Sequence, residues 1–319
     1  MNLTDMGTIK GLLGRHGFRF SKALGQNFLC DPDIPPAIAE GAGLTPGCGV
    51  LEVGPGIGTL TVELCQRARK VVAVELDRRL PPVLAETMGG FDNFTLVEGD
   101  ILKTDIPALC RQHFPGAYLP LKTPAINDFP AIHSPENLPN EPNREESADS
   151  SRMVLHAAAN LPYYITTPAV AALIDSGCFQ STTVMVQREV ARRMCAAPGT
   201  SDYGAFTVYL NYHTAPRLIL DVPRDCFIPA PNVDSAVVRL ERLPAPPVET
   251  DPAKLFFVIK AAFSQRRKTL LNCLTAAVQG KMTKTELENL LLSCGLSANA
   301  RGETLNLSEF AQIAEKLSI

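Results

Sequence analysis

"VLEVGPGIG", residues 50–58, is the stretch of sequence that decides the fold. A short apolar run leads into three glycines, and Leu60, Val62 and Leu64 then begin a helical stretch. Glycine lets the backbone turn sharply and lets a ligand approach main-chain N–H groups at a helix start. A tight turn without a ligand has the same pattern. The stretch therefore predicts a strand, a glycine loop and a helix.

Similar short apolar runs follow, with helical stretches between them. They lie at residues 71–74, 95–97, 153–158 and 182–186, with 217–222 and 234–240 as candidates for the last strands. Short apolar runs that alternate with helices indicate a parallel, doubly wound sheet. Such a sheet binds its ligands at the carboxyl ends of its strands.

Three consecutive strand ends carry groups suited to a nucleoside. After the glycine loop, Glu75 ends the second strand and can accept bonds from both hydroxyls of a ribose. Asp100 ends the third and can accept a bond from an adenine amino group, while Ile101 covers the ring. Taken alone, Glu75 is equally a helix-capping acid and Asp100 a turn former. Together the three strand ends predict a nucleoside pocket.

The fourth strand end indicates which nucleoside cofactor the pocket takes. Asn160, Leu161, Pro162 and the pair Tyr163-Tyr164 directly follow the run at 153–158. A dinucleotide pocket is disfavoured, because its fingerprint is G-x-G-x-x-G and Thr59 occupies the last glycine position.

At this point the chain resembles the ribosomal RNA adenine dimethyltransferases, and within them the bacterial small-subunit branch. The resemblance covers nearly the whole chain from Lys22, apart from residues 111–152. It rests on these motifs: Gly25-Gln26-Asn27-Phe28-Leu29, Glu52-Val53-Gly54-Pro55-Gly56-Ile57-Gly58, Glu75-Leu76-Asp77, Gly99-Asp100, Asn160-Leu161-Pro162-Tyr163, Phe227-Ile228-Pro229-Ala230-Pro231-Asn232-Val233-Asp234-Ser235 and Arg266-Arg267-Lys268-Thr269.

The resemblance implies a fold, a cofactor and a reaction. The fold is an α/β class I S-adenosylmethionine-dependent methyltransferase, Rossmann-like, with a seven-stranded, mostly parallel sheet and a small C-terminal all-helical domain. The cofactor is S-adenosyl-L-methionine. The reaction is N6,N6-dimethylation of two adjacent adenosines near the 3′ end of 16S rRNA, within the immature small ribosomal subunit, with a role in subunit biogenesis.

The resemblance also assigns cofactor-binding residues. It gives Asn27 and Leu29 to a lid over the cofactor, Gly54 to its methionine end and Glu75 to its ribose. Asp100 is assigned to the adenine, and Asn160 to the point where cofactor and target base meet.

The catalytic residues follow from the weakness of the nucleophile, since the lone pair of the adenine N6 is delocalised into the ring. The Asn160 side-chain oxygen and the Leu161 carbonyl can accept its two N–H bonds. Pro162 helps to present that carbonyl. Tyr163 would stack on the flipped base, which is worth about 1–3 kcal/mol. Phe227 is a candidate for the other face, although a core phenylalanine is the alternative.

The transfer is an in-line displacement from a sulfonium, so positioning matters more than a strong base. No histidine is required, and no metal is expected. The nine cysteines are scattered singly, without a C-x-x-C pair, which indicates reduced thiols. The N-terminal residues lack the apolar core of a signal peptide, and no segment is long enough to span a membrane. We therefore expect a cytoplasmic protein, acting as a monomer.

Contacts with RNA phosphates must come from local patches, because thirty Lys and Arg face thirty-three Asp and Glu. Some of the arginines could instead form structural ion pairs, and the N-terminal arm could simply be solvated. The candidate patches are Lys10, Arg15, Arg19 and Lys22; Arg188, Arg192 and Arg193; and Arg266, Arg267 and Lys268.

The expected domains follow composition. A basic N-terminal arm and cofactor lid occupies 1–30, a methyltransferase domain 31–243 and a C-terminal helical RNA-binding domain 244–319. Within the second, the proline-rich residues 111–152 predict a flexible insertion. In the third, a helix is predicted from Leu287, Leu290, Leu291 and Cys294 at helical spacing, with Thr283 and Glu286 as a capping box.

Two other functions remain open. One is the large-subunit rRNA adenine methyltransferase branch, which confers antibiotic resistance, although the stretches at 227–235 and 266–269 favour the small-subunit branch. The other is a ribosome-assembly or transcription factor that keeps the fold and its grip on RNA without catalysis. A nicotinamide oxidoreductase is opposed by the glycine spacing.

Overall fold

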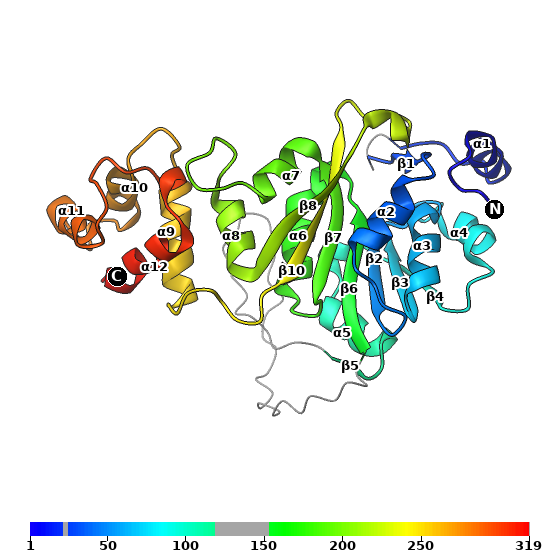
Figure 1. The fold of residues 1–319 in the computed structure, drawn as a ribbon, viewed down its shortest axis with the longest axis horizontal. Helices are drawn as coiled ribbons and strands as arrows, with labels where there is room; N and C mark the ends of the chain where they lie inside the picture. Colours follow the sequence, from blue (N-terminus) through cyan, green and yellow to red (C-terminus); the bar gives the residue numbers. More distant parts are fainter. Residues whose placement is uncertain (22–24, 119–152, 319) are drawn as a thin grey trace. The chain divides into compact units, whose positions relative to one another are not determined.

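The computed structural model describes residues 1–21, 25–118 and 153–318 (Figure 1). The chain forms two compact units. The first consists of Met1–Arg188 with Ile219–Arg239, and the second of Glu189–Leu218 with Leu240–Ile319. The predicted boundary between the methyltransferase domain and the C-terminal domain at residue 244 stays a prediction. The second unit also contains residues before 244, namely Glu189–Leu218 and 240–243.

The sheet confirms the predicted fold, a Rossmann-like arrangement with seven strands in one path. Their order is β4-β3-β2-β6-β7-β10-β8, and β5 pairs with β6 outside this path. The pairings from β4 to β7 are parallel. The bounds are β2 (Gly49–Val53), β3 (Lys70–Glu75), β4 (Phe94–Glu98), β5 (Ala117–Tyr118), β6 (Met153–Asn160), β7 (Ser181–Gln187), β8 (Thr214–Val222) and β10 (Ser235–Arg242).

The strand order reverses beside β2. The chain runs outward from β2 through β3 to β4, and then returns to place β6 on the other side of β2. Val53 lies opposite both Val74 and Ala159, so β2, β3 and β6 end level with one another. Ligands of open α/β sheets bind at such a reversal, outside the carboxyl ends of the strands.

Helices of the first unit cover the sheet and complete its core. Buried side chains from α3 and α4, such as Leu64 and Val83, pack in one cluster with Val50 and Val71 of the strands. All five residues of β2 are buried, as expected for a central parallel strand. The helices are α1 (Met6–Arg15), α2 (Ile34–Gly41), α3 (Thr59–Arg67), α4 (Pro81–Met88), α5 (Ile106–His113), α6 (Thr166–Asp175) and, at the boundary between units, α7 (Arg188–Met194).

The N-terminal arm is partly helical and packed. Asp5 caps α1 by accepting the Thr8 N–H at 2.7 Å, and α1 buries three apolar side chains in the core. Arg15 and His16 both pair with Glu86 of α4. This end of the arm therefore belongs to the folded unit. Lys22 lies outside the described residues.

The predicted insertion begins inside regular structure. Residues 111–118 complete α5 and form β5. The rest of it, 119–152, lies outside the described residues, and its flexibility stays a prediction.

The second unit is mainly helical. Leu287, Leu290 and Leu291 are buried along one helix, as their spacing predicts. Its capping box is also confirmed, because Glu286 donates its N–H to Thr283 Oγ1 at 3.2 Å and accepts the Thr283 N–H at 2.6 Å. The helices are α8 (Ala205–His213), α9 (Pro252–Phe263), α10 (Leu270–Ala277), α11 (Lys284–Ser293) and α12 (Leu307–Lys316).

Short elements complete the described chain: strands β1 (Phe28–Leu29) and β9 (Phe227–Ile228), and 3₁₀ turns η2 (Ile101–Lys103), η3 (Tyr163–Ile165), η4 (Arg224–Cys226) and η5 (Gly302–Thr304). None of the helices in the described ranges has the length and apolar character to cross a membrane.

One histidine of the second unit is buried without a polar partner. His213 is 5% exposed, and neither ring nitrogen has a hydrogen-bond partner among the described residues. Tyr209, Tyr212 and Phe256 surround its ring. Burial lowers the pKa of His213 from 6.5 to about 4, and the positive charge of Arg242 adds to this effect. The histidine is therefore neutral in the folded protein at pH 6.

We expect His213→Phe to reduce the loss of stability in acid. Below pH 6.5 the unfolded chain binds a proton at this histidine that the folded chain takes up only near pH 4. This penalty grows as the pH falls and reaches at most about 3 kcal/mol. Urea unfolding at pH 7, 5.5 and 4.5 measures this penalty as the difference in the free energy of unfolding between the parent and the variant. Parallel pH profiles for the two proteins would contradict the assignment.

Candidate active site

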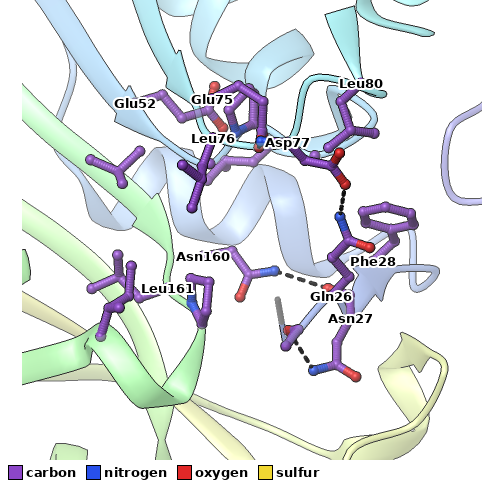
Figure 2. A pocket seen from close by; sticks show the side chains of 18 of the residues that line it. Gln26, Asn27, Phe28, Glu52, Glu75, Leu76, Asp77, Leu80, Asn160 and Leu161 are labelled. Atoms are coloured by element: carbon purple, nitrogen blue, oxygen red, sulfur yellow. Dashed lines mark hydrogen bonds between the residues drawn. The ribbon is translucent and has the colours of Figure 1, made fainter. Parts of the chain in front are cut away.

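One pocket of the first unit gathers every residue that the sequence singles out for catalysis or cofactor binding. It lies at the carboxyl ends of β2, β3 and β6, where the strand order reverses (Figure 2). The predicted residues on its wall are Asn27, Leu29, Gly54, Glu75, Asp100, Asn160, Leu161, Pro162, Tyr163 and Phe227. The structure therefore brings them together, and their individual roles are proposals taken up below.

The three glycines of the loop share a positive φ, but the space around each of them differs. All have positive φ, +69° at Gly54, +60° at Gly56 and +92° at Gly58. A Cβ at Gly56 would lie 3.1 Å from the Phe28 ring, and one at Gly58 would lie 2.9 Å from the sulfur of Met88. A Cβ at Gly54 would meet no atom of the described residues within 4 Å. Gly54, directly after the end of β2, thus leaves open space at the pocket wall.

Two buried carboxyl groups face this pocket from neighbouring strands. Glu52 of β2 is 1% exposed, and its Oε2 has no hydrogen-bond partner in the described part of the chain. Burial is the main cause that raises the pKa of Glu52 to about 8, and the charge of the nearby Glu75 contributes to this shift. Burial also raises the pKa of Glu75, although the Asp77 N–H, 2.7 Å from its Oε1, opposes the shift. Such a pocket favours a ligand that carries positive charge.

Glu52 was not singled out from the sequence as a site residue. The sequence feature that could have identified it is an acidic side chain inside an otherwise apolar strand. Such residues are seldom fully buried unless they have a partner.

Asp100 forms a turn, as one interpretation of the sequence expects, while its assignment to the adenine stays a prediction. It lines the pocket, and its carboxylate also accepts the Leu102 N–H at 3.0 Å as the cap of the η2 turn. Lys103 Nζ lies 3.7 Å from Asp100 Oδ2. The neighbouring Ile101 is buried against the pocket wall. The turn therefore holds Asp100 at the pocket through one carboxylate oxygen, and the other oxygen is the one near Lys103.

The segment Gly25–Leu29 forms the opposite wall. Its end pairs as β1 with β9, with Leu29 opposite Phe227. Gln26 donates to Asp77 at 2.7 Å, and the Asn27 carbonyl accepts a bond from Asn160 at 3.2 Å. Figure 2 shows both bonds. The segment is thus fastened to the ends of two strands, β3 and β6.

Asn160 is oriented by this contact. Because its Nδ2 donates to the Asn27 carbonyl, its Oδ1 remains available as an acceptor. The following backbone is held to β7, since Leu161 donates its N–H to Met185 at 3.2 Å. Pro162 then leads into η3. The structure therefore places an amide oxygen on a fixed backbone at the pocket.

The two tyrosines differ in their surroundings. Tyr163 is half-buried, and its hydroxyl is 3.0 Å from the Ser235 hydroxyl. Tyr164 is 57% exposed, although it also lines the pocket, and its ring lies 3.7 Å from the position of a Gly25 Cβ. Phe227 is buried in the core and also lines the pocket, so the core interpretation is confirmed and its role against the target base stays a prediction.

The fold and the site together define a class I methyltransferase. The decisive combination is a sheet that reverses at its glycine loop, with acids at the ends of β3 and β4 and Asn-Leu-Pro-Tyr at the end of β6.

Comparison with protein families narrows this class, because residues 17–314 match the ribosomal RNA adenine dimethylase family. The chain belongs to this family, as its motifs predict. It is 41% identical to the ribosomal RNA small subunit methyltransferase A of Geobacillus thermodenitrificans, over 99% of this chain and 97% of the relative. It is also 41% identical to the Streptococcus pneumoniae protein of that name, over 99% and 98%.

Solved structures agree with the fold. A dimethyladenosine transferase from Plasmodium falciparum superposes with a TM-score of 0.63 at 23% identity, covering 89% of this chain and 95% of that one. The 23S rRNA methyltransferase ErmE gives 0.61 at 26% identity, covering 91% and 99%.

The buried acid at Glu52 should destabilise the protein in the absence of ligand. In the unfolded chain this carboxyl ionises near pH 4.5, but in the folded chain only near pH 8. The folded state therefore loses stability relative to the unfolded state as the pH rises between these values, by up to about 4 kcal/mol from pH 5 to 8. Glu52→Gln should remove the loss, and denaturant unfolding at both pH values measures it. An equal loss in parent and variant would contradict the burial effect.

Proposed function

We propose that this protein transfers methyl groups from S-adenosyl-L-methionine to N6 of two adjacent adenosines near the 3′ end of 16S rRNA in the immature small ribosomal subunit. The observation that carries the proposal is the position of Asn160, whose oriented amide lies on the same pocket as the glycine loop and the two buried acids. We further propose that the protein works as a monomer in the cytoplasm and contributes to subunit biogenesis.

The residues of the pocket fit this cofactor. S-adenosyl-L-methionine, when bound, supplies a methyl group on a positively charged sulfur. The buried carboxyls of Glu52 and Glu75 favour the charge of its ammonium and sulfonium groups, and Glu75 can also accept bonds from ribose hydroxyls. The open space at Gly54 admits the methionine end. Asp100 can accept a bond from the adenine amino group.

Leu29 and Asn27 line the remaining side of the cofactor pocket, as expected for the lid. Both are tied to other parts of the first unit, Leu29 through its pairing with Phe227 and Asn27 through Asn160.

The chain promotes transfer by orienting the target amine. Asn160 Oδ1 accepts one N–H bond of the amine and the Leu161 carbonyl accepts the other, so the nitrogen is held and its lone pair is less delocalised. After the first methylation one N–H bond remains, and one acceptor still holds the amine. Tyr163 stacks on the base, and the bond to Ser235 restricts its ring. Phe227 supports the other face. Once N6 has accepted the methyl group it carries a positive charge and readily loses a proton to water, so positioning matters more than a strong base.

Sequence identity to named relatives favours small-subunit RNA as the substrate. This chain is 41% identical to named small-subunit methyltransferases over nearly their whole length, but 26% identical to a 23S rRNA enzyme. Phosphate contacts are supported by exposed cations in the second unit, namely Arg192, Arg193, Arg266, Arg267 and Lys268. Arg188 is a weaker candidate, because it forms an ion pair with Asp234 at 3.1 Å.

The proposal is tested by incubating the protein with labelled S-adenosyl-L-methionine and, in separate reactions, with immature small subunits or with large-subunit RNA. We expect N6,N6-dimethyladenosine in the small-subunit RNA, and Asn160→Ala should lower turnover at least about 100-fold, because one fixed acceptor for the amine is lost. Label only in large-subunit RNA would favour the antibiotic-resistance branch. No label, with normal binding to the subunit, would favour a non-catalytic assembly factor.

Gly54→Ala should weaken cofactor binding, since its methyl group would enter the space that we assign to the methionine end. Gly116→Ala is the matched control, because Gly116 has a φ of +77°, open surroundings and no place in the pocket wall. Each change should cost about 1–2 kcal/mol of strain. Calorimetric titration with S-adenosylhomocysteine should show about a tenfold rise in Kd for Gly54→Ala alone. Equal changes in both variants would refute the assignment.

A further inference from the structure

Gln26 is bonded at both ends of its side-chain amide. Its Oε1 accepts the Ser21 N–H at 3.0 Å, and its Nε2 donates to Asp77 Oδ2 at 2.7 Å. The side chain therefore connects the N-terminal segment with the end of β3, and Figure 2 shows it reaching Asp77 across the pocket wall. Because both polar ends have partners, the orientation of the amide is determined.

Asp77 is the centre of this connection. It is 6% exposed, and the Arg79 guanidinium, 2.6 Å from its Oδ2, holds the pKa of the carboxyl below its usual range. Its main-chain N–H donates to Glu75 Oε1 at 2.7 Å. One residue thus orients the carboxylate assigned to the ribose and, with its own charge, holds Gln26 in place.

Arg79 extends the same connection to the other side of the N-terminal segment. Its Nη1 donates to the Arg19 carbonyl at 3.0 Å, and its guanidinium lies 4.8 Å from the centre of the Phe18 ring. Asp77 therefore holds the N-terminal segment at two separate points, directly at Gln26 and through Arg79 near Arg19.

The position of Gln26 affects the pocket through Asn27, the residue that follows it. The Asn27 carbonyl accepts the bond that orients Asn160, and Phe28 and Leu29 then enter β1. The wall formed by Gly25–Leu29 is thus fastened at β3 by Gln26 and at β6 by Asn27. If the bond at β3 is lost, one of these two anchors is gone.

We propose that Gln26 and Asp77 are a pair of positioning residues, which hold Gly25–Leu29 against the end of β3 and thereby determine how tightly the pocket retains an adenosine-containing ligand. Neither residue needs to contact the reacting atoms. The inference rests on the proposed function, because it takes the ligand to be S-adenosyl-L-methionine or its product.

The first test is calorimetric titration of the full chain with S-adenosylhomocysteine. Gln26→Ala should raise Kd about tenfold, since a hydrogen bond to a buried carboxylate is lost. Asp77→Ala should raise it at least as much. The double variant should be no weaker in binding than Asp77→Ala alone, because each change removes the same bond between Gln26 and Asp77. Additive losses, or unchanged Kd values, would overturn the proposal.

A reversal of the bond tests the pair itself. Gln26→Glu alone places two carboxylates against each other and should weaken binding more than Gln26→Ala. Combining it with Asp77→Asn exchanges donor and acceptor, and should recover at least half of the loss in log Kd. Failure to recover, in a double variant that melts within a few degrees of Gln26→Glu, would contradict a direct coupling.

Asn93→Ala is the matched control for general loss of structure. The Asn93 amide also makes two hydrogen bonds, to the carbonyls of Cys65 at 2.8 Å and Ala68 at 3.0 Å, and it does not line the pocket. We expect this variant to lower Tm and to leave Kd unchanged.

The titration also separates this inference from the proposed function. If the parent protein does not bind S-adenosylhomocysteine, the proposed cofactor is wrong. If the parent binds it and Gln26→Ala binds it equally well, only the positioning role is wrong. A turnover assay over a range of cofactor concentrations up to saturation adds a second distinction, because Gln26→Ala should raise the KM for cofactor by a larger factor than it lowers kcat.

Discussion

The parallel register of β2 between β3 and β6 is the constraint on which the site depends. Val53 lies opposite both Val74 and Ala159, so the glycine loop, Glu75 and Asn160 emerge at one level. The register is stable because β2 is buried over its whole length, and a slip by one residue would reverse the face of every side chain. The chemistry of three separate motifs therefore depends on strand pairing that none of them contains.

The electrostatics of the pocket depend on the same arrangement. Glu52 and Glu75 lie on adjacent strands in a buried setting, and the charge of Glu75 disfavours the ionised form of Glu52. In the absence of a cation this lowers the stability of the fold, a cost that is common where a site is prepared for a charged ligand. Asp77 behaves differently, because Arg79 compensates its charge. It can therefore serve as a permanent anchor for Gln26.

Sequence reasoning succeeded where the controlling interactions are local. The glycine loop needs positive φ at three positions, and the capping box of α11 joins residues three apart. The strand ends with Glu75, Asp100 and Asn160 were predicted because apolar runs stop there. It missed Gln26 and Asp77 as a pair, since they are fifty-one residues apart and only their hydrogen bond relates them. The ion pair of Arg188 with Asp234 was hidden for the same reason.

The order of apolar runs, glycines and polar strand ends was thus sufficient to predict a parallel α/β sheet with a nucleoside pocket, because these patterns reflect backbone preferences within a few neighbours. The resemblance of the motifs to a known family supplied the methyltransferase fold and the remaining pocket residues. Only the folded chain decided that Gln26 meets Asp77, that Asn27 orients the Asn160 amide and that Glu52 is buried beside Glu75. Such contacts join residues distant in the chain, and their geometry exists only after the sheet has formed.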